Sequence, residues 1–196
     1  MEPKYILASA SPRRQALLKE CGLTFEVLIT DADERVDEAL TPDAYVAVVC
    51  KRKAEAAVAK LIAGHRESPE LTVIAADTVV ALKGEIFGKP ESTADAERML
   101  KALQGATHQV YTGITVATFT AEAPQYITDI CATDVTFKPL TKAEISAYVA
   151  TGEPMDKAGA YAVQGLGAAL IKELDGDYNN VVGISTTRLL QLLKTL

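Results

Sequence analysis

Residues 6–14 read Ile-Leu-Ala-Ser-Ala-Ser-Pro-Arg-Arg, and this stretch says most about the fold and the site. A short apolar run predicts a strand that leads into a helix. Ser11 suits the N-cap, because its hydroxyl can accept from free backbone N–H groups, and Pro12 suits the first helical position. A helix N-terminus attracts anions, and Arg13 and Arg14 can bind phosphate oxygens. The corner is therefore a candidate polyphosphate site; the alternative is a capped helix with two solvated arginines.

Strand and helix patterns alternate outward from this corner. Helices are expected at 12–21, 41–63, 92–103, 141–150 and 183–196. Strands are expected at 5–8, 25–29, 72–82, 85–87, 109–119, 126–137 and 168–174, with 181–182 extended and 152–167 a glycine-rich loop. The pattern predicts an α/β fold with a mixed, strongly twisted sheet and long antiparallel strands. We expect a single domain, residues 1–196, made of two lobes around a central cleft that would bind the ligand.

Composition limits the classes of function. The 196 residues are 48% hydrophobic, which suits one folded core. A formal charge of -6 argues against a general nucleic-acid binder but leaves room for a small anionic ligand. The three cysteines are scattered and lack metal-ligand spacing, so we expect free thiols in a reducing cytoplasm. The chain has no apolar run of the roughly 18 residues that a membrane span needs, and no signal peptide is expected.

Asp77 follows the apolar run 73–76 and precedes Thr78. A carboxylate in so apolar a strand is costly unless it is paired or binds a metal. The alanines before it leave room for a ligand to approach closely. We therefore expect Asp77 to be functional; a structural Asp at a strand end is the alternative.

An acidic stretch could supply a second carboxylate. Most of its side chains are expected to be solvated, and one or two could join Asp77 in holding Mg²⁺, which takes carboxylates together with substrate phosphates. The candidates are Asp31, Asp33, Glu34, Asp37 and Glu38.

Two lysines could supply charge for phosphates. Lys53 lies within the long helix, and Lys89 stands between a glycine and a proline on a tight turn. Solvated surface lysines are the alternative. The loop at 152–165 is of the kind that lines sites, or it is a mere connection; its candidate polar groups are Glu153, Asp156, Lys157 and Gln164. The two histidines, His65 and His108, have no evident catalytic partner in the sequence.

Taken together, these residues form a spaced series that covers the chain from end to end and resembles the Maf nucleoside triphosphate pyrophosphatases, in particular their dTTP/UTP branch. The motifs, in order, are Ser9-x-Ser11-Pro-Arg13-Arg14, Glu34, Lys53-Ala-Glu-Ala, Ala-Asp77-Thr, Gly-Lys89-Pro, Tyr-Thr-Gly113, Gly-Glu-Pro154, Asp156-Lys-Ala-Gly159, Gln164-Gly and Gly-Asp-Tyr-Asn179.

The resemblance implies an inosine-triphosphatase-like fold and a cytoplasmic, metal-dependent hydrolase. It would cleave a nucleoside triphosphate to the monophosphate and pyrophosphate, with Mg²⁺ or Mn²⁺ as cofactor. Asp77 would be the proton acceptor, and Glu34 and Asp77 would hold the metal. The remaining implied residues would contact the triphosphate or the base: Ser9, Ser11, Arg13, Arg14, Lys53 and Lys89. The resemblance also allows a homodimer, although no interface is visible in the sequence.

Three positions indicate the substrate class within the family. The branch that acts on 7-methyl-GTP carries an aromatic residue, Gln and Glu where this chain has Arg13, Thr78 and Gln164. An aromatic face and a carboxylate suit a cationic base, whereas an amide and a hydroxyl can read the edge of uracil or thymine. The resemblance thus predicts dTTP and UTP as substrates, with no nucleic-acid or membrane partner.

Two rival readings follow from the same resemblance. One is the branch that prefers 7-methyl-GTP. The other is a non-catalytic regulator of septum formation, a role associated with the family. House-cleaning of modified nucleotides and a link to arrest of cell division are further expectations for the enzyme.

Overall fold

The structure is a computed structural model that describes residues 4–36 and 39–196. Its strands are β1 (Tyr5–Leu7), β2 (Phe25–Val27), β3 (Thr72–Leu82), β4 (Glu85–Phe87), β5 (Thr107–Thr118), β6 (Gln125–Phe137) and β7 (Ile171–Asp175). Its α-helices are α1 (Pro12–Glu20), α2 (Pro42–Ala63), α3 (Thr93–Leu103), α4 (Lys142–Ala150), α5 (Tyr178–Val182) and α6 (Thr186–Leu193). Residues 153–170, here called the 3-10 segment, contain three short 3-10 helices, Glu153–Asp156, Ala158–Ala160 and Gly165–Leu170.

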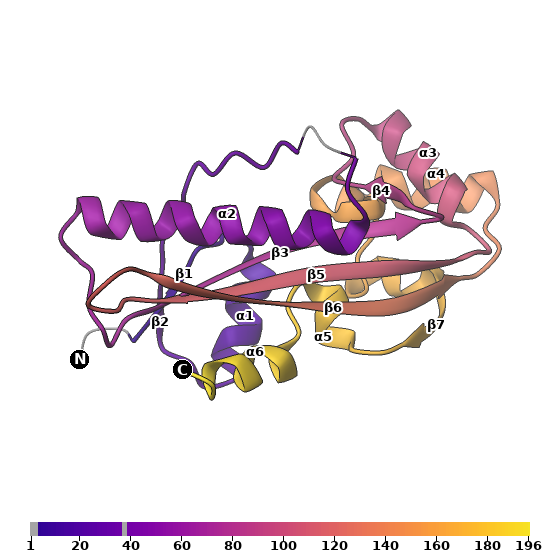
Figure 1. The fold of residues 1–196 in the computed structure, drawn as a ribbon. Coiled ribbons are helices and arrows are strands. Elements are labelled where there is room, and N and C mark those ends of the chain that lie inside the picture. Colours follow the sequence, from indigo (N-terminus) through magenta and orange to yellow (C-terminus); the bar gives the residue numbers. More distant parts are fainter. Residues whose placement is uncertain (1–3, 37–38) are drawn as a thin grey trace.

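The predicted mixed sheet is confirmed. Seven strands form it in the order β2-β1-β3-β5-β6-β7, with β4 pairing with β3. The short strand β1 runs parallel to both β2 and β3, and the other pairings are antiparallel. The three long strands β3, β5 and β6 carry the other elements, as Figure 1 shows.

One edge of β3 is covered at its two ends by different strands. β1 pairs with Thr72–Ile74, and β4 pairs with Val80–Leu82. Residues 75–79 lie between these two pairings. Asp77 and Thr78 therefore sit at a break in the strand layer, where they can be reached from outside the sheet.

The two faces of the sheet carry different helices. α2 packs on one face, where Ala54, Ala57, Val58 and Leu61 meet strand residues that include Val73 and Ala75. On the other face, α1 and α6 pack against Ile74 and Ala76. Figure 1 shows α2 above the sheet and α1, α5 and α6 below it. Side chains alternate between the faces of a strand, so Asp77 faces α2 and Thr78 faces α1.

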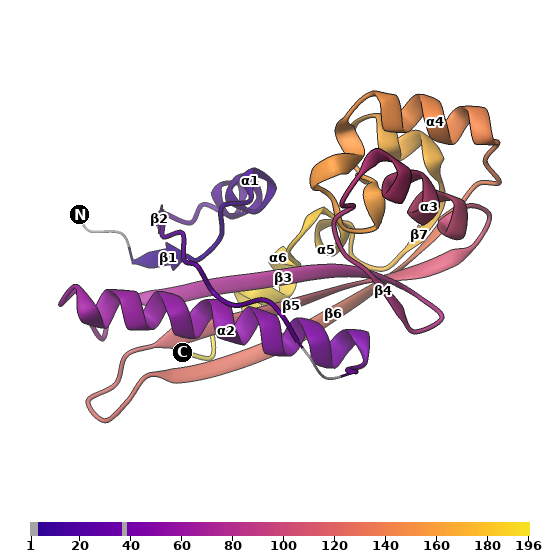
Figure 2. The same cartoon turned by 90° about the horizontal axis from the view of Figure 1, so that it is seen from above.

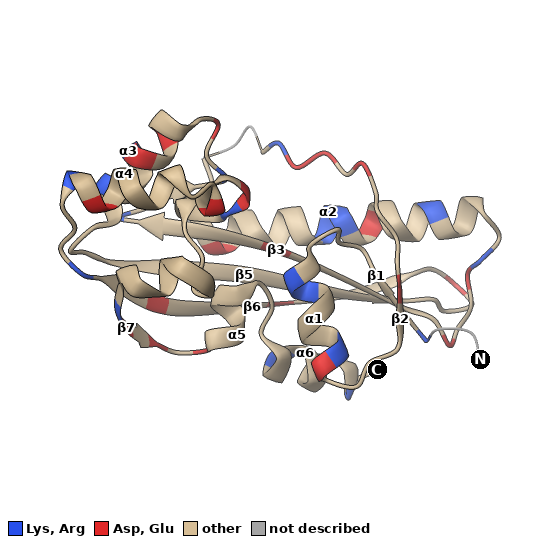
Figure 3. Ribbon diagram, turned by 180° about the vertical axis from the view of Figure 1, so that it is seen from behind, with Lys and Arg blue, Asp and Glu red and all other residues tan. Residues whose placement is uncertain are grey.

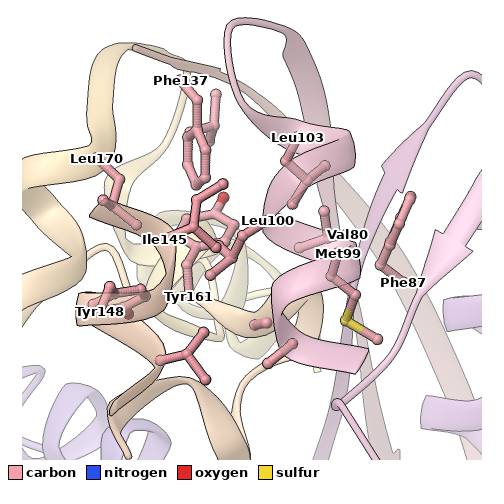
Figure 4. Packing of buried hydrophobic residues seen from close by; sticks show 14 of the residues in the cluster. Val80, Phe87, Met99, Leu100, Leu103, Phe137, Ile145, Tyr148, Tyr161 and Leu170 are labelled. Atoms are coloured by element: carbon pink, nitrogen blue, oxygen red, sulfur yellow. The ribbon is translucent and has the colours of Figure 1, made fainter. Parts of the chain in front are cut away.

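A second core lies at the far end of the sheet. There α3, α4 and the 3-10 segment enclose a cluster that includes Phe87, Leu100, Phe137 and Tyr161 (Figure 4). His108 is buried against it, with its ring edge-on to Phe137 and its Nε2 2.9 Å from the Tyr161 hydroxyl. Burial lowers the pKa of His108 to about 4, against an opposing effect of Asp134. His108 is thus a core residue.

Several predicted boundaries near the end of the chain are wrong. The strand expected at 168–174 begins at Ile171, because Ala168–Leu170 belong to a 3-10 helix. Val181 and Val182, expected to be extended, lie in α5. The helix expected from Gly183 begins at Thr186, after an N-cap at Ser185. The region expected to be a loop, 152–167, is largely 3-10 helix.

Within the described ranges, no helix combines the length and the hydropathy that crossing a bilayer requires.

Candidate active site

A cleft of about 570 Å³ opens at the break in the strand layer. It lies between α1 and the 3-10 segment, which stand apart along one side of β3 in Figure 2. The structure brings all ten predicted site residues to its wall, although they come from distant parts of the sequence: Ser9, Ser11, Arg13, Arg14, Glu34, Lys53, Asp77, Thr78, Lys89 and Gln164.

The start of α1 forms one wall of the cleft as the sequence predicts. Ser11 is the N-cap, and its hydroxyl accepts from the backbone N–H of Arg14 at 3.4 Å. Pro12 occupies the first turn. The Ser9 hydroxyl accepts from the backbone N–H of Ser11 at 3.2 Å, which shapes the turn before the helix. Both serines and both arginines of this corner line the cleft.

Asp77 and Lys53 form the most buried ion pair of the cleft wall. Lys53 extends from α2, and its Nζ lies 2.7 Å from Asp77 Oδ1; the two side chains are 14% and 12% exposed. Glu34 approaches the same ammonium, with Oε1 at 3.1 Å from Nζ. Two carboxylates therefore share one cation. This pairing provides the compensation that a carboxylate in an apolar strand requires.

Gly113 allows α2 to come this close to the sheet. It pairs with Asp77 across the β3–β5 ladder. A Cβ built on Gly113 would lie 2.6 Å from the Val46 carbonyl oxygen and 2.8 Å from Cys50 Sγ, both on α2. Because real Cβ atoms do not approach so closely, any other residue would push α2 outward. The glycine thus sets the distance between Lys53 and Asp77.

Arg14 is half-buried and bonds to protein on three sides. Its Nε donates to the Gly183 carbonyl at 2.8 Å, one terminal nitrogen donates to Ser9 Oγ at 3.3 Å, and the other donates to Thr78 Oγ1 at 3.0 Å. Burial lowers the pKa of Arg14, although Asp77 nearby opposes this. Arg14 joins α1, β3 and the loop after α5 into one unit, and its remaining N–H groups are left for a ligand.

Arg13 reaches across the cleft to the 3-10 segment. One of its terminal nitrogens lies 3.3 Å from Asp156 Oδ2, and Lys157 binds the other oxygen of the same carboxylate. The Asp156 side chain is 65% exposed. Exposed ion pairs contribute little stability, about 0–1 kcal/mol. This contact can therefore open to admit a ligand without unfolding the cleft.

Lys89 and Gln164 line the cleft from the side opposite α1. Lys89 follows Gly88, whose carbonyl accepts from the backbone N–H of Gly159 at 3.0 Å. This bond ties the turn after β4 to the 3-10 segment. Glu153, also a sequence candidate, does not line the cleft; its carboxylate accepts from the N–H groups of Leu166 and Gly167 and holds the segment's shape.

The charge of the cleft differs from that of the whole chain. Its lining contains five basic side chains, Arg13, Arg14, Lys53, Lys89 and Lys157, against three acidic ones, Glu34, Asp77 and Asp156. Figure 3 shows the basic residues of α1 and α2 within a chain of formal charge -6. A local positive excess suits a polyanion, because it concentrates negative charge at the site.

The cleft has two chemically different walls. On the α2 side it is charged, with Lys53, Asp77 and Glu34. On the α1 side of β3 it includes Val163 and Val182, which also belong to the core beneath. A ligand with a charged end and a flat, less polar end would fit both walls at once.

The described residues fit a metal ion that arrives with the ligand better than a resident one. No group of three or more His, Cys, Asp or Glu side chains among them is placed to hold a metal. Glu34 and Asp77 nevertheless converge on one point, which the Lys53 ammonium occupies. Mg²⁺ is commonly held by one or two carboxylates plus substrate phosphates. Of the other acidic candidates of this loop, Asp31 and Asp33 do not line the cleft, and Asp37 and Glu38 lie outside the described residues.

The residues that hold Arg14 and Thr78 in place are not among those predicted from the sequence. Thr112 bonds Thr78 through their hydroxyls at 2.8 Å, and the Gly183 carbonyl accepts from Arg14. Asp177 caps α5 by accepting from Asn179 and Asn180 N–H groups, and so fixes the loop that carries Gly183. The motif Gly-Asp-Tyr-Asn179 contains the capping residue Asp177. A helix N-cap of this kind has no specific functional meaning by sequence alone.

Comparison with known proteins matches the chain over nearly its full length. The family model described as Maf-like protein matches residues 4–196. A "dTTP/UTP pyrophosphatase" of Gloeobacter violaceus is 45% identical over 193 residues, covering 98% of this chain and 96% of its own. Proteins with the same name are 49% identical in Pelotomaculum thermopropionicum (96% and 94% covered) and 42% identical in Shigella sonnei (95% and 90%).

Proposed function

The chain belongs to the Maf family, and from this premise we propose that it is a nucleoside triphosphate pyrophosphatase acting on dTTP and UTP. The reaction releases the nucleoside monophosphate and pyrophosphate. The observation that carries the proposal is the cleft with two walls, where a largely buried Asp77–Lys53 pair at 2.7 Å lies on one side and the apolar side chains of Val163 and Val182 lie on the other. A nucleotide has matching ends, with charged phosphates and a flat base.

We assign the chemistry to the charged wall. The Asp77 carboxylate accepts a proton from the attacking water, for which it must lie within hydrogen-bond reach of that water. Lys53 contacts Asp77 in the free enzyme, and its ammonium is placed to neutralise phosphate charge once substrate enters. Lys89 and the start of α1, with Ser9, Ser11 and Arg13, supply further donors for the phosphates. Arg14 keeps this wall in place and adds positive charge.

A divalent cation, Mg²⁺ or Mn²⁺, would be held by Glu34 and Asp77 together with substrate phosphates. When bound, such a cation polarises a phosphoryl oxygen and favours loss of a proton from the attacking water. Lys53 would have to leave the point between the two carboxylates.

We assign the choice of base to the other wall, with Arg13, Thr78 and Gln164. A neutral amide and a hydroxyl complement the carbonyl and N–H edge of uracil or thymine. The base would rest against Val163 and Val182, since these apolar side chains lie on the same side of β3 as Thr78. The three free cysteines support a reducing, cytoplasmic location.

The test is a screen of nucleoside triphosphates with Mg²⁺ or Mn²⁺, with pyrophosphate and orthophosphate measured separately. We expect dTTP and UTP among the best substrates and pyrophosphate as the product. Asp77→Asn should lower kcat by about 100-fold or more. Asp129→Asn is the matched control, because Asp129 lies on β6 in an ion pair with Arg188, away from the cleft lining.

Three outcomes would contradict the proposal. Release of orthophosphate would indicate a different bond cleaved. A strong preference for 7-methyl-GTP would place the chain in the other branch. An Asp77→Asn protein that loses hydrolysis yet still arrests cell division would favour the regulatory role over catalysis.

A further inference from the structure

Thr112 is a buried residue of β5 that lies directly behind Thr78. It is absent from the cleft lining and so has no contact of its own with a ligand in the cleft. Its hydroxyl donates to the Asn180 carbonyl at 3.1 Å. A hydroxyl has one hydrogen to donate and two lone pairs to accept with. Thr112 has therefore used its hydrogen, and towards Thr78 it can only accept.

The role of Thr78 follows from the same count of one hydrogen and two lone pairs on its hydroxyl. Its Oγ1 is 2.8 Å from Thr112 Oγ1, so its hydrogen points to Thr112. The Gly183 carbonyl is a poorer acceptor for this hydrogen, because it lies farther away, at 3.3 Å, and already accepts from Arg14 Nε. One lone pair of Thr78 Oγ1 receives the Arg14 hydrogen bond. What remains for a ligand is one lone pair, so Thr78 presents an acceptor to the cleft and no donor.

An acceptor at this position distinguishes between pyrimidines. Uracil and thymine carry an N–H donor at N3, whereas cytosine has an unprotonated N3 with a lone pair. An acceptor pairs with the first and repels the second, and mispairing a desolvated polar group is costly. We propose that Thr112 is a positioning residue: by taking the Thr78 proton, it makes Thr78 an acceptor that selects uracil or thymine over cytosine. This inference rests on the proposed function.

The test compares kcat and KM for UTP and CTP in three variants. Thr112→Val keeps the shape but removes the hydroxyl. Among the described residues, Thr78 is then left with the Gly183 carbonyl, a longer contact at 3.3 Å to an oxygen that already takes a hydrogen bond from Arg14 Nε. We expect the ratio of kcat/KM for UTP over CTP to fall by roughly tenfold. Thr112→Ser keeps the hydroxyl and should stay within about twofold of the wild-type ratio.

Thr115→Val is the matched control. Thr115 is buried on the same strand and bonds Thr128 through their hydroxyls at 2.8 Å, but it is absent from the cleft lining. Loss of the Thr115 hydroxyl should lower the melting temperature as Thr112→Val does. It should leave the ratio of kcat/KM for UTP over CTP unchanged. A purely structural role for Thr112 would make the two valine variants behave alike.

A substrate analogue tests the same inference without any variant. N3-methyl-UTP lacks the N3 hydrogen, and the wild type should cleave it at least about tenfold less efficiently than UTP. Cleavage as efficient as that of UTP would overturn the inference, as would an unchanged UTP:CTP ratio in Thr112→Val or a relaxed ratio in Thr112→Ser. If Thr112→Val does not fold, the inference is tested by the UTP:CTP ratio of Thr112→Ser and by the cleavage of N3-methyl-UTP. A wild type that cleaves neither UTP nor dTTP would instead defeat the proposed function itself.

Discussion

Lys53 balances the negative charge of the wall to which we assign the chemistry, because two carboxylates share its single ammonium. Lys53→Met keeps the approximate length of the side chain but removes its charge. We predict that this variant lowers kcat/KM for UTP by about 100-fold or more. The measurement is steady-state release of pyrophosphate. Lys51→Met is the control, since Lys51 lies on the same helix in an exposed pair with Glu55. A Lys53→Met enzyme with half the wild-type activity would contradict the role assigned to this lysine.

Arg14 is needed for its shape as much as for its charge. Three of its nitrogens donate to acceptors from three separate segments, and a lysine cannot reach all three. We predict that Arg14→Lys lowers the free energy of unfolding by about 2 kcal/mol, measured by urea titration. Arg13→Lys should cost under about 1 kcal/mol, because its partner Asp156 is largely exposed. Equal losses in the two variants would speak against this account.

The packing of α2 on β5 depends on Gly113. A methyl group there would collide with the helix backbone at 2.6 Å. We predict that Gly113→Ala lowers the free energy of unfolding by about 1–3 kcal/mol and reduces activity, because α2 carries Lys53 away from Asp77. Urea unfolding and pyrophosphate release test this together. Gly64 is the C-cap of the same helix, and a Cβ built on it would lie 3.4 Å from its nearest neighbour. Gly64→Ala should therefore change the free energy of unfolding and the activity only slightly.

Most helices and strands were predictable because their signals are local. The β-prone run at 72–82 and the turn at Lys83-Gly84 predict β3 and β4 with the bounds that the structure shows. The prediction failed at Val181 and Val182, where β-branched side chains favour a strand. There, Asp177 accepts from the N–H groups of Asn179 and Asn180 and starts a helix. A side-chain cap and burial of Val182 outweigh a weak intrinsic preference.

The residues that line the cleft were predictable as a set but not as an arrangement. Asp77, Lys53 and Arg14 stood out by residue type and motif. Their partners did not, because which strand lies beside which is decided by packing between distant segments. Thr112 looks like an ordinary strand threonine in sequence, and only the β3–β5 register places it opposite Thr78.

At the scale of the whole molecule, His108 makes stability depend on pH. Its pKa in the folded protein is about 4, below the ordinary 6.5, so the unfolded chain binds the proton first on acidification. Its contribution is fully present above about pH 6.5 and is lost as the pH falls towards 4, by up to about 3 kcal/mol. We predict that His108→Phe flattens the dependence of the urea midpoint on pH in this range.

His65→Asn serves as the control for this titration. His65 lies exposed in a loop with a positive φ of 52°, a conformation that Asn tolerates. This variant should retain the full pH slope of the wild type. A His108→Phe protein with an unchanged slope would mean that other groups govern the acid sensitivity.

The bond between Arg14 and the Gly183 carbonyl joins residues 169 positions apart. On a ribosome, the start of α1 is made early, and the carbonyl that holds its arginine is made only after every element from β1 to α5. At typical elongation rates of about 5–20 residues per second, this interval lasts on the order of ten seconds or more. During that time a nascent chain has no complete nucleotide pocket. Ligand binding can therefore report completed folding of this chain, but it cannot guide the early steps of its synthesis.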